Sequence, residues 1–147
     1  MASVRIGAFA IILDEQERVL LCHRRDVDLW NLPGGGMEVG ETPWQAVIRE
    51  VREEVCLAAE VVRLAGVYSK PDRDEIVFSF VCRIVGGVPV LTDEADQIGY
   101  FAFADLPRNT APKQVERIQD ALAYHPQPVL KVQVGPSSIE LINAGKL

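Results

Sequence analysis

A glycine-rich loop that runs directly into an amphipathic helix sets the strongest limit on the fold of this chain. Glycines occupy positions 34–36 and exclude regular helix there, while they permit backbone angles that other residues resist. Thr42 is a favourable N-cap and Pro43 a favourable first helical residue. We therefore expect a helix that begins near Thr42 and ends at about Val55.

One side of this helix is apolar and the other is acidic. The expected core-facing stripe consists of Trp44, Ile48, Val51 and Val55, at steps of 4, 3 and 4. Glu50, Glu53 and Glu54 stand at i, i+3 and i+4, so their carboxylates repel one another by a few tenths of a kcal/mol per pair. Arg49 can pair with Glu53, but one arginine does not neutralise three carboxylates. A hard divalent cation such as Mg²⁺ or Mn²⁺ can neutralise them. The simplest alternative is that the three glutamates form a solvated acidic face without a metal.

The rest of the chain alternates strand-like and helical patterns, which predicts an α/β sandwich with a mixed β-sheet and two main helices. With 147 residues the chain fits one domain, 1–147. We expect a hairpin or two neighbouring strands over 4–13 and 18–24, a second hairpin over 60–69 and 75–85, a strand at 98–103, a helix at 113–124, and a C-terminal strand pair within 127–143.

Charge and cysteine content narrow the class of partner. The formal net charge of −6 disfavours nucleic acid and anionic membrane, so a phosphate-bearing ligand requires a metal or a few local basic residues. The three cysteines form no CxxC pair, which disfavours a zinc site or a disulfide framework and indicates a cytoplasmic protein. No apolar run approaches the length of about 18 residues that a membrane helix needs.

The spacing of the loop and helix residues resembles the signature of the Nudix hydrolases. It consists of Gly35, five residues to Glu41, seven more to Arg49-Glu50, the aliphatic Val51, then Glu53-Glu54 and Leu57. The resemblance extends over about residues 4–124, through Leu20-Leu21, Arg24-Arg25, Trp30 to Gly35, and Gly99-Tyr100-Phe101. The departure is Cys56, where the family usually has glycine; we interpret it as a tolerated left-handed helix end.

The resemblance implies a Nudix-type α/β/α fold and a Mg²⁺-dependent pyrophosphohydrolase, with Mn²⁺ as a substitute. Glu50, Glu53 and Glu54, with the carbonyl oxygen of Gly35, would hold the metal. Glu53 or Glu54 would act as general base. Glu94, in the acidic loop 91–96, is a further candidate for that role, although an acidic surface loop is an equal alternative.

The remaining expected site residues support the carboxylates or contact substrate. Arg49 would orient the glutamates, and Glu41 would tie the glycine loop to the helix. Arg24 and Arg25 would clamp the second phosphate, unless they form surface ion pairs. We also expect substrate contacts at Leu32, Gly34 and Gly36.

The substrate is expected to be a small nucleoside diphosphate linked to another moiety. Pro71, 14 residues after Leu57, resembles a proline of ADP-ribose-cleaving members and favours ADP-ribose or a nucleotide sugar. An alternative substrate is an oxidised nucleoside triphosphate, for which a base-reading asparagine would be expected at the position of Thr110, next to Asn109. Two alternative functions are a catalytically silent ligand sensor and an isoprenoid diphosphate isomerase. The tail after Pro126 matches no family pattern and could contribute to a homodimer.

Overall fold

The computed structural model describes residues 3–123 and 125–147, and within them eight strands form two sheets. The strands are β1 (Arg5–Ile12), β2 (Val19–Arg24), β3 (Trp30–Asn31), β4 (Gly34–Gly36), β5 (Ala58–Lys70), β6 (Glu75–Gly86), β7 (Ala95–Phe101) and β8 (Val129–Val132). The larger sheet has the order β4-β1-β6-β5-β8 and the smaller one β3-β2-β7. The pairs β1–β6 and β5–β8 are parallel and the others antiparallel, so the expected mixed sheet is confirmed.

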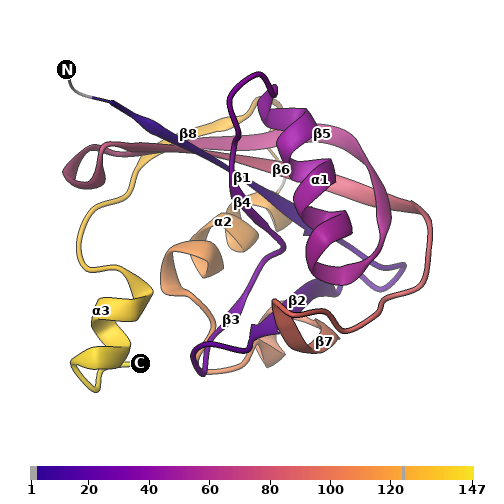
Figure 1. Ribbon diagram of the computed structural model, residues 1–147. Helices are drawn as coiled ribbons and strands as arrows, with labels where there is room; N and C mark the ends of the chain where they lie inside the picture. The colour runs from indigo at the N-terminus through magenta and orange to yellow at the C-terminus, as the bar shows by residue number, and fades with distance from the viewer. Residues whose placement is uncertain (1–2, 124) are drawn as a thin grey trace.

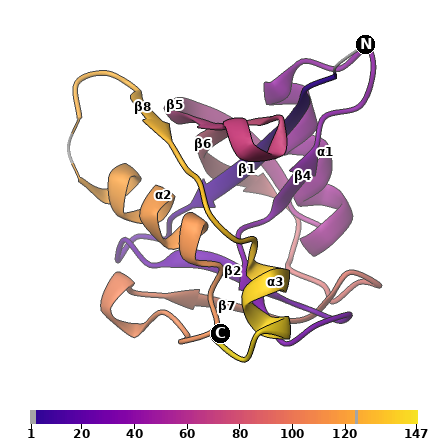
Figure 2. The same cartoon turned by 90° about the vertical axis from the view of Figure 1, so that its left-hand side faces the viewer.

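Two main helices, α1 (Pro43–Val55) and α2 (Pro112–Leu122), cover opposite faces of the larger sheet (Figure 1, Figure 2). The alternation of side chains along β1 explains this arrangement. Ala8, Ala10 and Ile12 belong to the core cluster that contains the buried face of α1, and Ile11 belongs to the cluster that contains Ile118 of α2. The fold is therefore an α/β/α sandwich, as expected.

The expectation of a hairpin or two neighbouring strands over 4–13 and 18–24 is only partly correct. β1 and β2 follow one another through the turn at Asp14, but they pair only at a single bridge between Leu13 and Val19 and then enter different sheets. Most residues of both strands are buried, and a two-stranded ribbon alone could not bury both apolar runs. β2 pairs instead with β7. The second hairpin, β5–β6, is confirmed, and a short 3₁₀ turn at Pro71–Arg73 joins its strands.

Helix α1 begins and ends where expected, but its buried face differs. The side chain of Thr42 accepts a hydrogen bond from the Gln45 N–H, and Cys56 ends the helix with a φ of 60° in the left-handed region. Trp44 is wrong as a core residue, because it is 54% exposed in the first turn of the helix. The buried positions are Ala46, Val47, Val51, Glu54 and Val55. Glu54 therefore lies on the core side of the helix, not on a solvated acidic face.

The C-terminal strand pair is also only half correct. β8 adds to the edge of β5, opposite Gly66 to Ser69, but residues Ser138–Asn143 form a short helix, α3 (Figure 2). Ser137 explains the difference, because its hydroxyl accepts a hydrogen bond from Glu140 N–H and caps the helix. The expected end of α2 at Tyr124 lies outside the described residues. No described helix combines the length and the apolar character that crossing a bilayer requires.

Candidate active site

Three carboxylates from two elements meet beside the glycine loop. Glu50 and Glu54 project from successive turns of α1, and Glu94 comes from the loop before β7. Each offers one carboxylate oxygen, and these oxygens lie within 4.8 Å of one another. The structure thus brings the distant glutamate expected from the sequence to two of the helix glutamates.

The loop that carries Glu94 is fastened to the end of α1. The hydroxyl of Thr92 donates to the carbonyl oxygen of Glu54 at 2.8 Å, and the N–H of Val90 donates to that of Val55 at 3.1 Å. The N–H of Glu94 in turn donates to the Thr92 hydroxyl. These bonds use carbonyl groups that a helix end leaves without intrahelical partners.

Burial makes the charged form of Glu54 costly. Its side chain is 9% exposed, and burial, followed by the nearby Glu50, raises its pKa to about 8. Its partners are weak: the Cys22 thiol at 3.5 Å and the Gly34 N–H at 3.4 Å. Burial also raises the pKa of Glu50, against the opposing effect of Arg49. A cation that bound here would offset both the desolvation and the repulsion.

Arg49 connects the glycine loop to the helix. Its guanidinium donates two hydrogen bonds to Glu41, at 2.7 and 3.0 Å, and one to the carbonyl oxygen of Gly36 at 3.0 Å. It also contacts Glu50 and Glu53, each at 3.1 Å. These bonds, those with Glu41 first, raise the pKa of Arg49. Arg49 and Glu41 thus join the glycine loop to the helix, while their expected roles in catalysis stay predictions.

Glu53 lies apart from the other carboxylates. Its side chain is 47% exposed and is hydrogen-bonded to Arg49. It is not one of the three residues whose oxygens converge. Its expected roles as metal ligand and base stay predictions.

The glycines of β4 allow the loop to approach β1 and α1 closely. Gly34 has a φ of 154°, and a Cβ there would collide with the carbonyl oxygen of Ala8. A Cβ on Gly35 would lie 2.7 Å from Oε1 of Glu50. A side chain at either position would therefore displace β4 or the carboxylate.

A cavity of about 430 Å³, which we name the carboxylate cavity, opens beside Glu54 and Glu94. Arg24, Arg25 and Gly34 contribute to its wall. Arg24 is occupied by Asp26, to which it donates two hydrogen bonds, whereas Arg25 donates to the carbonyl oxygen of Thr92. Both arginines expected at a phosphate are thus placed near the carboxylates.

The other expected contacts lie differently. The Leu32 side chain is fully buried in the core, and its N–H donates to the side chain of Gln114 at 2.6 Å. Gly36 borders a second cavity. Asn109 donates to Asp28, and Thr110 is 2% exposed, so both are engaged in the packing of the loops.

Sequence reasoning missed two residues of this region, Gln114 and Cys22, both of which line the carboxylate cavity. Gln114 carried a usable signal, because a polar residue at that position interrupts the buried stripe of α2 that continues at Ile118 and Ala121. Cys22 lies within the apolar run of β2, where nothing distinguishes it from a core residue.

The two ring nitrogens of His23 both contact carboxylates, which provides a test by pH. Nε2 lies 2.7 Å from Asp28 and Nδ1 2.7 Å from Asp96, and only the imidazolium can donate from both nitrogens. The bond to Asp28 has the largest effect, and it raises the pKa of His23. The contacts of the imidazolium with Asp28 and Asp96 therefore stabilise the folded state fully below about pH 6.5. This stabilisation is lost as the pH rises through the raised pKa.

We therefore expect the melting temperature of His23→Gln to fall below that of the wild type by about 3 °C more at pH 6 than at pH 9. Loss of the contact between His23 and Trp30 adds an offset that does not depend on pH. Thermal unfolding of both proteins checks this, with His125→Gln, at an exposed position, as the control. A gap that is the same at both pH values would contradict it.

Comparison with known proteins gives a consistent assignment. Residues 4–122 match the NUDIX domain family. A protein of Bacillus subtilis (strain 168) named "Putative 8-oxo-dGTP diphosphatase" is 34% identical over 116 residues, which cover 78% of this chain and 77% of that protein. An ADP-ribose pyrophosphatase of Methanocaldococcus jannaschii is 36% identical over 104 residues, which cover 66% of this chain and 62% of that protein.

A solved structure is similar over most of its length. The crystal structure of an ADP-ribose pyrophosphatase from Streptococcus suis 89-1591 matches with a TM-score of 0.73 and 25% identity, over 89% of this chain and 100% of that chain. Together with the family match and the arrangement of Arg49 and the glutamates, these similarities show that the chain belongs to the Nudix hydrolase family and acts on phosphate anhydride bonds.

Proposed function

We propose that this enzyme is a Mg²⁺-dependent pyrophosphohydrolase that cleaves a nucleoside diphosphate linked to another moiety, with ADP-ribose or a nucleotide sugar as the first choice. The observation that carries the proposal is the convergence of Glu50, Glu54 and Glu94 beside a cavity bordered by Arg24 and Arg25. Acidic groups for a cation and basic groups for phosphate then lie in one place.

The donor set fits a hard divalent cation. The converging donors are carboxylate oxygens, which Mg²⁺ and Mn²⁺ prefer. Burial raises the pKa of the neighbouring Cys22 thiol, so Cys22 stays protonated and does not favour a soft metal. When bound, Mg²⁺ neutralises diphosphate charge and lowers the pKa of a coordinated water.

The protein residues then divide the work as follows. Glu50 and Glu54 would hold the cation, and Arg49 fixes Glu50 and the Gly36 carbonyl group in place. Glu54 and Glu94 line the carboxylate cavity and are the candidates to accept the proton of the attacking water. Glu53, which does not line this cavity, is the alternative candidate.

Arg25 is the better placed arginine for the substrate. No ion-pair partner within 4.0 Å occupies it among residues 3–123 and 125–147, whereas Arg24 is paired with Asp26. Arg25 would therefore contact the phosphate that does not undergo attack.

A panel assay tests the proposal. The substrates are ADP-ribose, a nucleotide sugar, a dinucleoside polyphosphate and 8-oxo-dGTP, in H₂¹⁸O with Mg²⁺. We expect the highest kcat/KM for ADP-ribose or the nucleotide sugar, with the ¹⁸O in one of two monophosphate products. Preferred release of pyrophosphate from 8-oxo-dGTP would favour the oxidised-nucleotide alternative, and tight binding without products would favour a sensor.

A further inference from the structure

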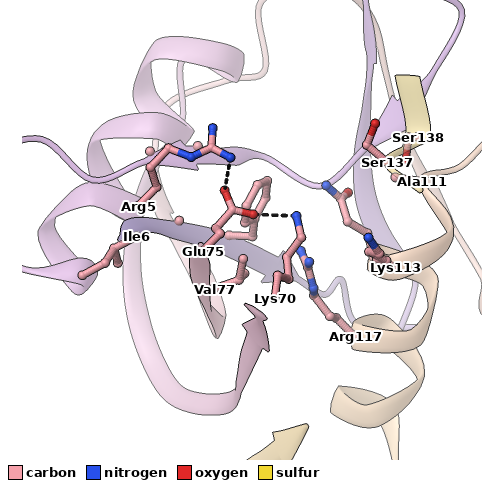
Figure 3. Close-up of a pocket in the computed structure, with 15 residues that line it drawn as sticks. Arg5, Ile6, Lys70, Glu75, Val77, Ala111, Lys113, Arg117, Ser137 and Ser138 are labelled. Atoms are coloured by element: carbon pink, nitrogen blue, oxygen red, sulfur yellow. Dashed lines mark hydrogen bonds and ion pairs between the residues drawn. The ribbon is translucent and has the colours of Figure 1, made fainter. Parts of the chain in front are cut away.

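A second cavity, of about 340 Å³, lies beside the carboxylate cavity and differs from it in charge. The two cavities share Phe9 and Gln114 in their walls, and the glycine loop continues from one to the other. We name this second space the basic cavity, since Arg5, Lys70, Lys113 and Arg117 line it together with a single carboxylate, Glu75 (Figure 3). This excess of positive charge occurs in a chain whose net charge is −6.

The single carboxylate is shared by two of the four cations. Figure 3 shows Glu75 between Arg5 and Lys70, at 3.9 Å from the arginine and 2.5 Å from the lysine. Lys113 and Arg117 have no carboxylate within 4.0 Å in the described part of the chain. Two positive charges in the wall are therefore left without an ion pair.

Arg117 is the more unusual of these two cations, because it is only 3% exposed. Its guanidinium lies 5.5 Å from the ring centres of both Phe9 and Tyr68, and its Nε donates to the side-chain oxygen of Gln133. Burial lowers its pKa to about 10. A buried charge whose hydrogen-bond and ring partners are all neutral is costly, since Glu75 and Glu116 act on it only from a distance, and an anion in the cavity would offset that cost.

The backbone of α2 adds to the same field. Ala111 is the N-cap of this helix and makes no side-chain capping bond, and the first turn contains no acidic residue. Ala111 and Lys113 both border the basic cavity. The positive end of the helix dipole therefore lies at a wall that already carries two unpaired cations.

We propose that the basic cavity binds a phosphate group of the substrate that is additional to the diphosphate cleaved at the glutamates. The inference rests on the proposed function, and it narrows the substrate to diphosphates that carry a further phosphate monoester. Lys113 and Arg117 donate hydrogen bonds to this phosphate, and Gln114 lies in the wall that the two cavities share. No bond to this phosphate is broken.

The first experiment measures binding without catalysis. Inorganic phosphate is titrated into the protein in EDTA, with the affinity read by calorimetry. Lys113→Gln is expected to weaken binding about tenfold or more, as for loss of a charge-assisted hydrogen bond. Lys131→Gln, which removes a lysine that contacts Glu116 and Asp120 and does not line the basic cavity, should leave the affinity within about twofold.

Arg117→Gln provides a second variant, with thermal unfolding to verify that it folds. Equal affinity in the wild type, Lys113→Gln and a folded Arg117→Gln, or no saturable binding by the wild type, would overturn the inference. The variants could lose affinity for phosphate while the wild type cleaves none of the panel substrates. That combination would support the phosphate site and contradict the proposed function.

The second experiment compares ADP-ribose with its 2′-phosphate. We expect Lys113→Gln to reduce kcat/KM for the phosphorylated compound about tenfold through KM, and for ADP-ribose itself by less than about twofold. An equal effect on both compounds would overturn the assignment of the site to substrate.

Discussion

Replacement of Glu54 by glutamine is expected to lower kcat by about a thousandfold or more, as for loss of a metal ligand or general base. Glutamine has nearly the same shape, but it cannot supply the negative charge that Glu54 would carry with a cation bound in the carboxylate cavity. Steady-state kinetics at saturating Mg²⁺ and substrate measure the effect. A kcat within about tenfold of the wild type would contradict the role proposed for Glu54.

The stability of the same variant separates a functional from a structural role. Because burial raises the pKa of Glu54 to about 8 while the unfolded chain titrates at its ordinary value of 4.5, the carboxylate opposes folding at neutral pH. In EDTA at pH 7 the melting temperature of Glu54→Gln should equal or exceed that of the wild type. A large decrease would show that the activity is lost through misfolding.

Glu53→Gln and Glu94→Gln are the matched variants, since each removes one charge from the same region. Glu94 belongs to the converging group, whereas Glu53 is bonded to Arg49 outside it. If the general base lies in the carboxylate cavity, Glu94→Gln should be more damaging than Glu53→Gln. The reverse order would assign the proton transfer to Glu53.

Removal of divalent cations is expected to lower turnover by about a thousandfold or more, because a bound cation contributes several kcal/mol of transition-state charge stabilisation. Dialysis against EDTA followed by addition of Mg²⁺ or Mn²⁺ tests this expectation. Activity should return with either ion, and the melting temperature should rise with ion concentration, since binding relieves the repulsion among Glu50, Glu54 and Glu94.

Glu54→Gln serves as the control for that rise in melting temperature, which should be smaller in the variant. Full activity in EDTA would contradict the metal dependence proposed here. Activity that returned only with a soft metal would contradict the oxygen donor set.

Local sequence signals predicted the glycine loop and α1 well. Thr42 satisfies N–H groups of the first turn, and Cys56 can end the helix because a single left-handed residue there is tolerated at a cost of about 1 kcal/mol. Both effects depend on neighbours within a few residues. Trp44 was misplaced because periodicity alone does not locate the end of the contact between α1 and the sheet.

Features that depend on distant partners were predicted less well. Nothing in the two apolar runs before residue 24 specifies that β1 joins β6 while β2 joins β7. The burial of Glu54 depends on Cys22 and Gly34, which are remote in the sequence. The basic cavity likewise brings Arg5 and Lys70 together with residues of α2, which lie far apart in the sequence.

The attachment of the Glu94 loop to the end of α1 divides the connection between β6 and β7 into two parts, which should differ in their tolerance of insertions and deletions. From Val90 to Ala95 the backbone is held at Val55, Glu54 and within the loop itself. Residues 87–89 have no such ties to α1 among the described hydrogen bonds. Insertions and deletions among relatives should therefore accumulate at 87–89, while the five-residue segment from Val90 to Glu94 keeps its length.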